Sequence, residues 1–299
     1  RYIFATAAAC LILASNSIAA LAALQPRLGT ASTFAVLGAA GITNAGATTI
    51  TGDVGTFPTT SETGFGPGAN TVTLSPGSVN HAGDAVTQGA KNAELTAYND
   101  LAGQTPCPIF GTNPGSLDGR TLTPGCYKFS SSAILNVGQT LILSGSGVYV
   151  FQIGSDLTIG NGTTVSLINN AQACGVYWQV TRDATVGTTA SFQGTMVAGR
   201  SISLNTGAVW TGRVLAGATL VQGAVTLLAN TITLPAANCA GLATVVPTPT
   251  PAVAGAPNGG GGPAQGQGFP WILAIVGAML GGAGVVSIGL SRRSDRRTR

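Results

Sequence analysis

The chain carries very little charge. Only 7% of its 299 residues are Asp, Glu, Lys or Arg, and it has one histidine, His81. Five of the 13 basic residues lie in the last eight positions, so the stretch from Leu24 to Val245 holds seven basic and eight acidic residues. A protein that binds nucleic acid needs a basic surface to neutralise phosphates. The nearly neutral body therefore excludes nucleic acid as an expected partner.

Motifs for metal binding and catalysis are also scarce. The sequence has no CxxC pair and a single histidine, so we expect no zinc site. Polysaccharide-cleaving enzymes built on β-helices need paired carboxylates, or a carboxylate with a base, in a groove. The acidic residues are scattered, and only Asp156 and Asp183 occupy equivalent positions of a repeat. We expect no enzymatic activity, metal or cofactor, with that one carboxylate pair as the alternative.

Glycine is abundant instead, and the two ends differ from the body. The 44 glycines follow no G-x-y period, which excludes collagen and suits an all-β protein with many tight turns. Residues 1–23 are apolar and end in small residues, which predicts a secretory signal peptide, with a short transmembrane anchor as the alternative. Residues 244–268 predict a Pro/Thr/Gly-rich linker. Residues 269–290 are uncharged and long enough to span a membrane, and the basic tail 291–299 is expected on the cytoplasmic side. The predicted location is extracellular, anchored to the cell membrane by that C-terminal span.

Four cysteines lie outside the predicted signal peptide: Cys107, Cys126, Cys174 and Cys239. An even number in an exported chain predicts disulfides. Three pairings are possible, and sequence proximity favours Cys107–Cys126 and Cys174–Cys239. Asn161 begins a glycosylation sequon, which has a meaning only in a eukaryotic secretory route.

An internal repeat organises the body of the chain. Phe151–Ile153 aligns with Trp178–Val180 at an offset of 27 residues, and then with Met196–Ala198 and Val214–Ala216 at offsets of 18. Each unit holds three short pieces in which apolar and polar residues alternate, so that side chains point to opposite faces. Stacking such units buries a core that no single unit could bury. The repeat predicts a three-sided parallel β-solenoid over residues 24–243, because a sandwich would not explain a constant offset.

Two segments depart from the repeat. Residues of about 81–103 carry apolar side chains, mostly alanine, at helical spacing, which predicts one long helix packed alongside the solenoid. Residues of about 56–80 hold Gly, Pro and Thr without a period and are expected to cap an end of the stack. The predicted fold class is therefore all-β with one long α-helix.

One outward position recurs in the second strand of each unit. It is occupied by Thr158, Thr185 and Ser203, with Thr226 expected next, and Ser201 is a flanking outward position. Parallel strands lie about 4.8 Å apart, so coils in register would align these side chains in a flat row. A threonine offers water both a methyl group to surround and a hydroxyl to bind. The row is either a surface that orders water or a set of good strand formers on a wet face.

Seven segments resemble, in this order, the DUF3494 ice-binding protein family: LGTASTFAVLGAAGITNAGATTITGDVGTFP (28–58), ETGFGPG (62–68), LTPGCYKFSSSAIL (122–135), GVYVFQIGSDLTI (147–159), CGVYWQV (174–180), FQGTMVAGRSISLNTGAVWTGRVLAG (192–217) and NTITLP (230–235). The resemblance covers about residues 28–238. It implies a discontinuous right-handed three-sided parallel β-solenoid, in which the N-terminal segment joins the stack beside the last coils. That arrangement would put Thr43 and Asn44 on the face that carries Ser203 and Thr226. Two departures are Ile134, where a small polar residue would suit the face better, and a longer stretch at 218–224.

The resemblance implies that the chain adsorbs to ice through ordered water on this face. It would then inhibit ice growth and recrystallisation, or attach the cell surface to ice, as a monomer whose partners are the ice surface and, through the C-terminal span, the membrane. The alternative is a cell-surface adhesin or structural envelope protein without ice affinity. The candidate ice-binding residues are Thr43, Asn44, Thr158, Thr185, Ser201, Ser203 and Thr226.

Overall fold

The computed structural model describes residues 22–68, 70–112, 114–219, 222–235 and 242, all within the first of two compact units of the chain. The predicted linker, the apolar stretch 269–290, the basic tail, Cys239 and all but the last two residues of the predicted signal peptide lie outside the described residues. Within the described ranges, no helix combines the length and the apolar character needed to cross a membrane.

Parallel strands form the three sides of a solenoid. The side that we call the helix face consists of β7 (Ile109–Gly111), β10 (Gly125–Phe129), β13 (Tyr149–Ile153), β16 (Val176–Val180), the second halves of β18 (Ser191–Ala198) and β20 (Val209–Ala216), β1 (Phe34–Gly38) and β4 (Asp53–Thr56). The second side, the row face, consists of β5 (Glu62–Thr63), β2 (Gly41–Ala45), β21 (Ala224–Leu228), β19 (Ile202–Leu204), β17 (Ala184–Val186), β14 (Leu157–Ile159), β11 (Ala133–Leu135) and β8 (Gly115–Ser116). The third face consists of β6 (Val72–Leu74), β3 (Thr48–Thr51), β22 (Thr231–Thr233), the first halves of β20 and β18, β15 (Thr164–Ile168), β12 (Thr140–Ser144) and β9 (Thr121–Leu122).

The sequence repeat is also the register of the strands. Phe151 pairs with Trp178, Trp178 with Met196, and Met196 with Val214, as the offsets of 27, 18 and 18 residues predict. The extra residues of the longer first step form a loop after β15, where Asn169 and Asn170 have positive φ angles, and the short helix η2 (Ala173–Gly175). The predicted three-sided parallel solenoid is therefore confirmed.

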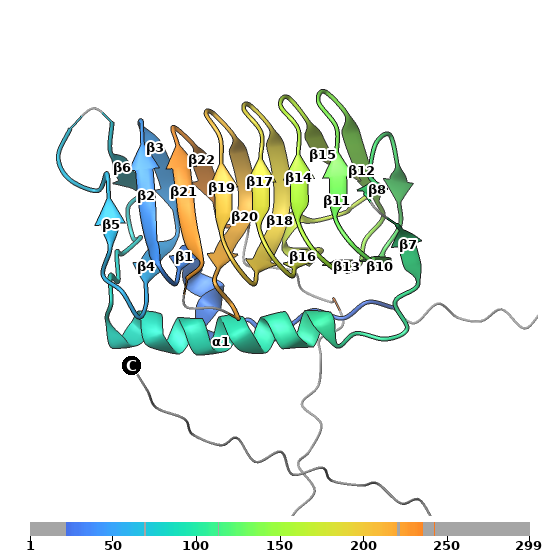
Figure 1. Cartoon of the computed structure of the whole chain (residues 1–299), viewed down its shortest axis with the longest axis horizontal. Helices are drawn as coiled ribbons and strands as arrows, with labels where there is room; N and C mark the ends of the chain where they lie inside the picture. Colours follow the sequence, from blue (N-terminus) through green and yellow to red (C-terminus); the bar gives the residue numbers. More distant parts are fainter. Residues whose placement is uncertain (1–21, 69, 113, 220–221, 236–241, 243–299) are drawn as a thin grey trace, which may run out of the picture. The chain divides into compact units, whose positions relative to one another are not determined.

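The stack is discontinuous in sequence, as the family resemblance implies. Strand β2 pairs with β21, and β3 pairs with β22, although the partners are separated by most of the chain. In Figure 1 the blue strand β2 lies directly beside the orange strand β21, and the green strands β8 and β11 lie at the other end. The first strands thus extend the stack beyond its last coil.

An aromatic column runs through the core along the stacking direction. The ring centroids of Phe151 and Trp178 lie 3.9 Å apart, those of Trp178 and Phe192 4.9 Å apart, and those of Phe192 and Trp210 4.6 Å apart. Tyr127 continues the column at 5.4 Å from Phe151. Burying one such side chain contributes on the order of 1.5–3 kcal/mol, and ring contacts add to it. The column therefore holds neighbouring coils in one register.

Strands β18 and β20 turn a corner of the solenoid without interruption. Each contains a glycine with positive φ, Gly194 at 107° and Gly212 at 156°, and the two pair with each other in register. A side chain at either position would collide with the backbone of the coil below. Glycine lets the strand bend from the third face to the helix face at this point.

Helix α1 (Ala85–Ala102) runs along the helix face, with the short helix η1 (Gly29–Thr33) beside it (Figure 1). Its N-cap is Asp84, whose Oδ1 accepts a hydrogen bond from the Thr87 backbone N–H at 2.8 Å. The helix begins four residues later than predicted, because Gly83 is in the left-handed region and Asp84 is extended. His81 consequently precedes the helix. The small side chains of Ala90 and Ala97 are fully buried against the solenoid, as the alanine-rich stripe predicts.

One acidic residue of α1 lies in this apolar contact. Glu94 is fully buried, and its Oε2 accepts a hydrogen bond from Lys91 Nζ at 2.6 Å. Lys91 Nζ also donates to the carbonyl oxygen of Ala216 at 2.8 Å, which ties the helix to β20. Burial raises the pKa of Glu94 to about 7, although the Lys91 ammonium opposes the shift.

The predicted disulfide between Cys107 and Cys126 is present and links the segment before β7 to β10. Cys174 is also disulfide-bonded. Its expected partner, Cys239, lies outside the described residues, so that pairing stays a prediction.

Candidate functional site

The row face carries one unbroken line of outward residues. One outward residue of each strand pairs in register with an outward residue of the next, across eight strands. From the capped end to the other end the members are Thr63, Thr43, Thr226, Ser203, Thr185, Thr158, Ile134 and Ser116. The structure therefore brings together the five residues that were expected in this row: Thr43, Thr158, Thr185, Ser203 and Thr226.

Alternation along each short strand keeps these side chains outside. Leu157 and Ile159 are buried while Thr158 between them is exposed, and Ala184, Thr185 and Val186 repeat the pattern. Within the described residues, the hydroxyls of Thr158, Thr185, Ser203 and Thr226 have no hydrogen-bond partner. They are free to bind water at the regular spacing of parallel strands, about 4.8 Å.

Asn44 does not lie on this face, and its assignment to the row is wrong. It follows Thr43 directly, so the alternation of the strand turns its side chain inward, where only 5% of it is exposed. Its Nδ2 donates to the Gly46 carbonyl oxygen at 2.8 Å, and its Oδ1 accepts from Thr48 Oγ1 at 2.6 Å. Asn44 closes the turn between β2 and β3.

Ser201 lies at the edge of the row face, where coils arrive from the helix face. Its Oγ accepts a hydrogen bond from the backbone N–H of Ala224 on the next coil, at 3.2 Å. Asp183 accepts from the Ser201 N–H at 3.0 Å, and Asp156 accepts from the Asp183 N–H at 3.2 Å. These three residues form a ladder that fastens each coil to the next.

The carboxylates of Asp156 and Asp183 therefore stabilise the stacking of the coils. Asp156 and Asp183 lie on adjacent coils, as the repeat predicts, but each carboxylate is engaged with the backbone of its neighbour. Arg182 Nε lies 3.8 Å from Asp156 Oδ1, and Arg200 Nε lies 3.6 Å from Asp183 Oδ2. From β14 to β19, the charged residues that flank the row face lie at this one edge.

The two ends of the row were not visible in the sequence. Strands β5 and β8 have two residues each, which is too short for alternation to be recognised. Only their pairing with β2 and β11 places Thr63 and Ser116 in the row. Ile134 stands between Ser116 and Thr158 and interrupts the hydroxyls with an apolar side chain.

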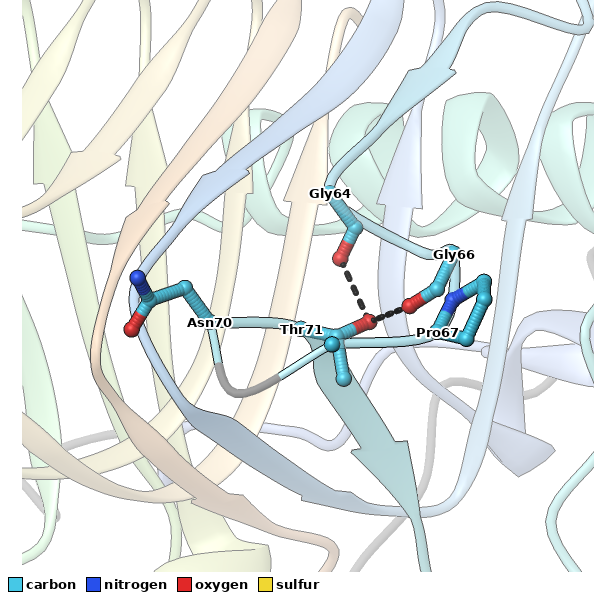
Figure 2. A pocket seen from close by; sticks show the side chains of 6 residues that line it. Gly64, Gly66, Pro67, Asn70 and Thr71 are labelled. Carbon is cyan, nitrogen blue, oxygen red and sulfur yellow. Dashed lines mark hydrogen bonds between the residues drawn. The ribbon is translucent and has the colours of Figure 1, made fainter.

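Residues 64–68 and 70–71 lie at the end of the stack that Thr63 occupies. The Thr71 hydroxyl lies between the carbonyl oxygens of Gly66 and Gly64, at 2.5 and 3.1 Å, and holds the loop closed (Figure 2). Gly64, Gly66, Pro67, Gly68, Asn70 and Thr71 line a hollow of about 410 Å³. Its lining is backbone and uncharged side chains, and the Thr71 hydroxyl in it is held by the carbonyl oxygens of Gly64 and Gly66.

No cluster of three or more His, Cys, Asp or Glu side chains occurs in the described part of the chain. The single histidine, His81, has its Nδ1 2.8 Å from Asp84 Oδ2 at the start of α1. The hydrogen bond from the Thr87 backbone N–H, and after it this contact with His81, hold the pKa of Asp84 below its usual range. The row face is thus a solenoid side that carries aligned hydroxyl side chains and offers no cluster for metal binding in the described residues.

Comparison with known proteins gives the family. The sequence model of the Ice-binding-like family matches residues 36–233, and the chain belongs to this family. It is 34% identical to an ice-binding protein of Flavobacterium frigoris (strain PS1), over 70% of this chain and 76% of that protein. It is 39% identical to an ice-binding protein of Nostoc sp. (strain HG1), over 71% and 76% of the two chains. A crystal structure of an ice-binding protein from an Antarctic biological consortium superposes with a TM-score of 0.65 and 41% identity, covering 73% of this chain and 96% of that one. The adhesin alternative gains no support from these relatives.

Proposed function

We propose that this chain binds ice through the row face and thereby restrains the growth and recrystallisation of ice. The observation that carries the proposal is the in-register line from Thr63 to Ser116, which presents uncharged side chains, all but Ile134 of them Thr or Ser, at the spacing of parallel strands. Membership in a family whose relatives are ice-binding proteins supports ice as the ligand. The geometry supports the row face as the surface that binds it.

The physical basis is the match between a rigid surface and ordered water. Each threonine offers a methyl group, around which water must arrange itself, and a hydroxyl that holds one water by a hydrogen bond. The coils cannot shift relative to one another, because the aromatic column and the Asp156–Asp183–Ser201 ladder fix them. Water bound along the row therefore keeps a fixed spacing and can join the surface of an ice crystal.

The position of the charges fits the same function. A charged side chain orients its own hydration shell and would disturb a regular water layer. Arg182, Asp156, Arg200 and Asp183 pair with one another at the edge of the face, beside the row and not within it. No bond is made or broken in this mechanism, and it requires neither a metal nor a cofactor.

An extracellular location belongs to the same proposal. The disulfide between Cys107 and Cys126 requires an oxidising compartment, and ice forms first outside the cell. The signal peptide over residues 1–23 and the anchor over residues 269–290 lie outside the described residues and stay predictions of the sequence.

Partitioning into ice tests the proposal directly. The full chain is mixed with a non-binding protein of similar size, and a polycrystalline ice shell is grown slowly through the solution. The chain should enrich in the ice fraction while the second protein is excluded. Equal exclusion of both proteins would contradict ice binding by this chain.

A further inference from the structure

The third face carries a larger regular array than the row face. Several of its strands, among them β3, β12, β15 and β22, place two residues on the outer side, and these residues form two columns. The first column contains Thr73, Thr49, Thr231, Val209, Ser191, Thr164 and Thr140. The second column contains Thr51, Thr233, Thr211 and Gln193, and beyond β18 it continues through Ser166, Ile142 and Thr121. Most members of both columns are threonine or serine.

The array is regular in two directions. Neighbouring strands lie about 4.8 Å apart, and the two columns are separated by two residues along a strand, about 6.6 Å. Thr49, Thr51, Thr231 and Thr233 are exposed and occupy the four corners of one such cell, because β3 and β22 pair residue for residue. Ile50 and Ile232 between them are fully buried, which fixes the outward direction of the threonines.

The third face is also free of charge. None of the residues of β3, β6, β9, β12, β15 and β22, nor of the first halves of β18 and β20, is charged. Helix α1 packs against the helix face, and in the described part of the chain no helix or further strand covers the third face. An uncovered sheet face without a single charge is unusual for a soluble protein, whose wet strands normally mix both signs of charge among their polar residues.

The corner between the row face and the third face is uncharged as well. The turns at residues 45–47, 136–139, 160–163, 187–190, 205–208 and 228–230 contain no Asp, Glu, Lys or Arg. Among the described turns of this corner, the one between β8 and β9, at the far end of the stack, has charges, Asp118 and Arg120. The turns at the other edge of the row face carry Asp156, Asp183 and their arginine partners. The boundary of the row face with the third face therefore has few charged residues, whereas its boundary with the helix face carries the ion pairs.

We propose that the third face is a second ice-binding surface, continuous with the row face around this uncharged corner. The inference rests on the proposed function, since the ligand of both faces is crystalline water. A single row of side chains can match the spacing of an ice surface along one direction. Two columns of hydroxyls and methyl groups can match it along two directions. Two flat faces that meet at an angle would contact different planes of the crystal.

Labelling of a single ice crystal tests this inference. The full chain is labelled with an amine-reactive dye and adsorbed to an ice hemisphere, on which the fluorescent regions report the crystal planes that are bound. The double variant Thr211→Tyr/Thr233→Tyr places two bulky side chains in the second column, while tyrosine still suits a strand. It should lose at least one set of planes that the wild-type chain labels, and it should keep the planes that depend on the row face.

Three further chains make the result decisive. Thr185→Tyr identifies the planes that belong to the row face, and Leu95→Tyr adds an aromatic ring to the outer side of α1, where it should change nothing. The single variant Thr211→Tyr serves if the double variant melts earlier than the wild-type chain by circular dichroism. A folded third-face variant that labels every wild-type plane at full intensity would overturn the inference. A wild-type chain that labels no plane would instead overturn the proposed function itself.

Discussion

Trp178 lies flat on Phe151, with ring planes 9° apart and centroids 3.9 Å apart. Seven residues further along the chain from each ring, on the next strand of each coil, Thr185 lies beside Thr158 in the same register. The first contact is in the core and the second is on the surface, yet they are one structural relationship. Because the coils are stacked by their cores, the spacing of the surface hydroxyls is set by side chains that never meet the ligand.

Trp178→Ala should therefore destabilise the fold strongly. Trp178 is fully buried and contacts rings on both sides of the column, and its Nε1 donates to the Gln193 carbonyl oxygen at 2.9 Å. Removing such a side chain costs about 3–5 kcal/mol. Urea unfolding measures the loss, and Trp178→Phe, which keeps a ring in the column, should cost clearly less. Equal losses in the two variants would show that stacking of the column does not matter.

Thr185→Tyr and Ser203→Tyr should abolish most ice activity and leave stability nearly unchanged. Both side chains point out from the middle of the row, and a tyrosine at either position would hold a flat crystal surface away from its neighbours. Surface substitutions of this kind usually change stability by less than about 0.5 kcal/mol. Recrystallisation inhibition and thermal melting give the two readouts, with Leu95→Tyr on α1 as the matched control. Undiminished inhibition by both row variants would remove the row face from the proposal.

Asp183→Ala should loosen the ladder between coils. The carboxylate accepts the Ser201 N–H, and without it that donor would lose its partner. The expected cost is about 1–2 kcal/mol, as for a lost helix cap. Asp183→Asn keeps an acceptor oxygen at the same place and should retain most of the stability, although it removes the charge that faces Arg200. If Asn is as harmful as Ala, the ion pair and not the hydrogen bond is the stabilising contact.

Glu94→Gln should change how stability depends on pH. The pKa of Glu94 is raised by burial from 4.5 to about 7, so the folded state binds this proton more tightly than the unfolded state. Its contribution is therefore most favourable below about pH 4.5 and is lost as the pH rises toward 7. The full difference is on the order of 3 kcal/mol at about 1.4 kcal/mol per pKa unit.

Unfolding free energies of the two chains at pH 4.5, 5.5, 6.5 and 7.5 measure this effect. Lowered pKa values, such as that of Asp84, act below this window, and Glu62, whose pKa burial raises, is the same in both chains. The difference between wild type and Glu94→Gln should therefore grow across the window in favour of the variant. A constant difference would mean that Glu94 titrates normally in the folded protein.

The sequence determined the solenoid, its coil registers and the identity of most of the row. Alternation of apolar and polar residues is local, and it repeats, so the offsets of 27 and 18 residues could be found by alignment and became the pairings of Phe151, Trp178 and Met196. The position of Thr226, displaced from the regular spacing, was predicted correctly for the same reason. The side of α1 that meets the solenoid followed from the alanine stripe.

Tertiary structure decided what lies beyond local alternation. Whether Thr63 and Ser116 belong to the row depends on which strands pair with β5 and β8. A strand of two residues shows no alternation from which that pairing could be predicted. Asn44 was assigned to the wrong side, because a resemblance placed its segment on the row face but only the strand geometry says which residues of that segment point out. The charge-free third face can likewise be recognised only in the folded chain, because its strands are distant in sequence and become neighbours only when the coils stack.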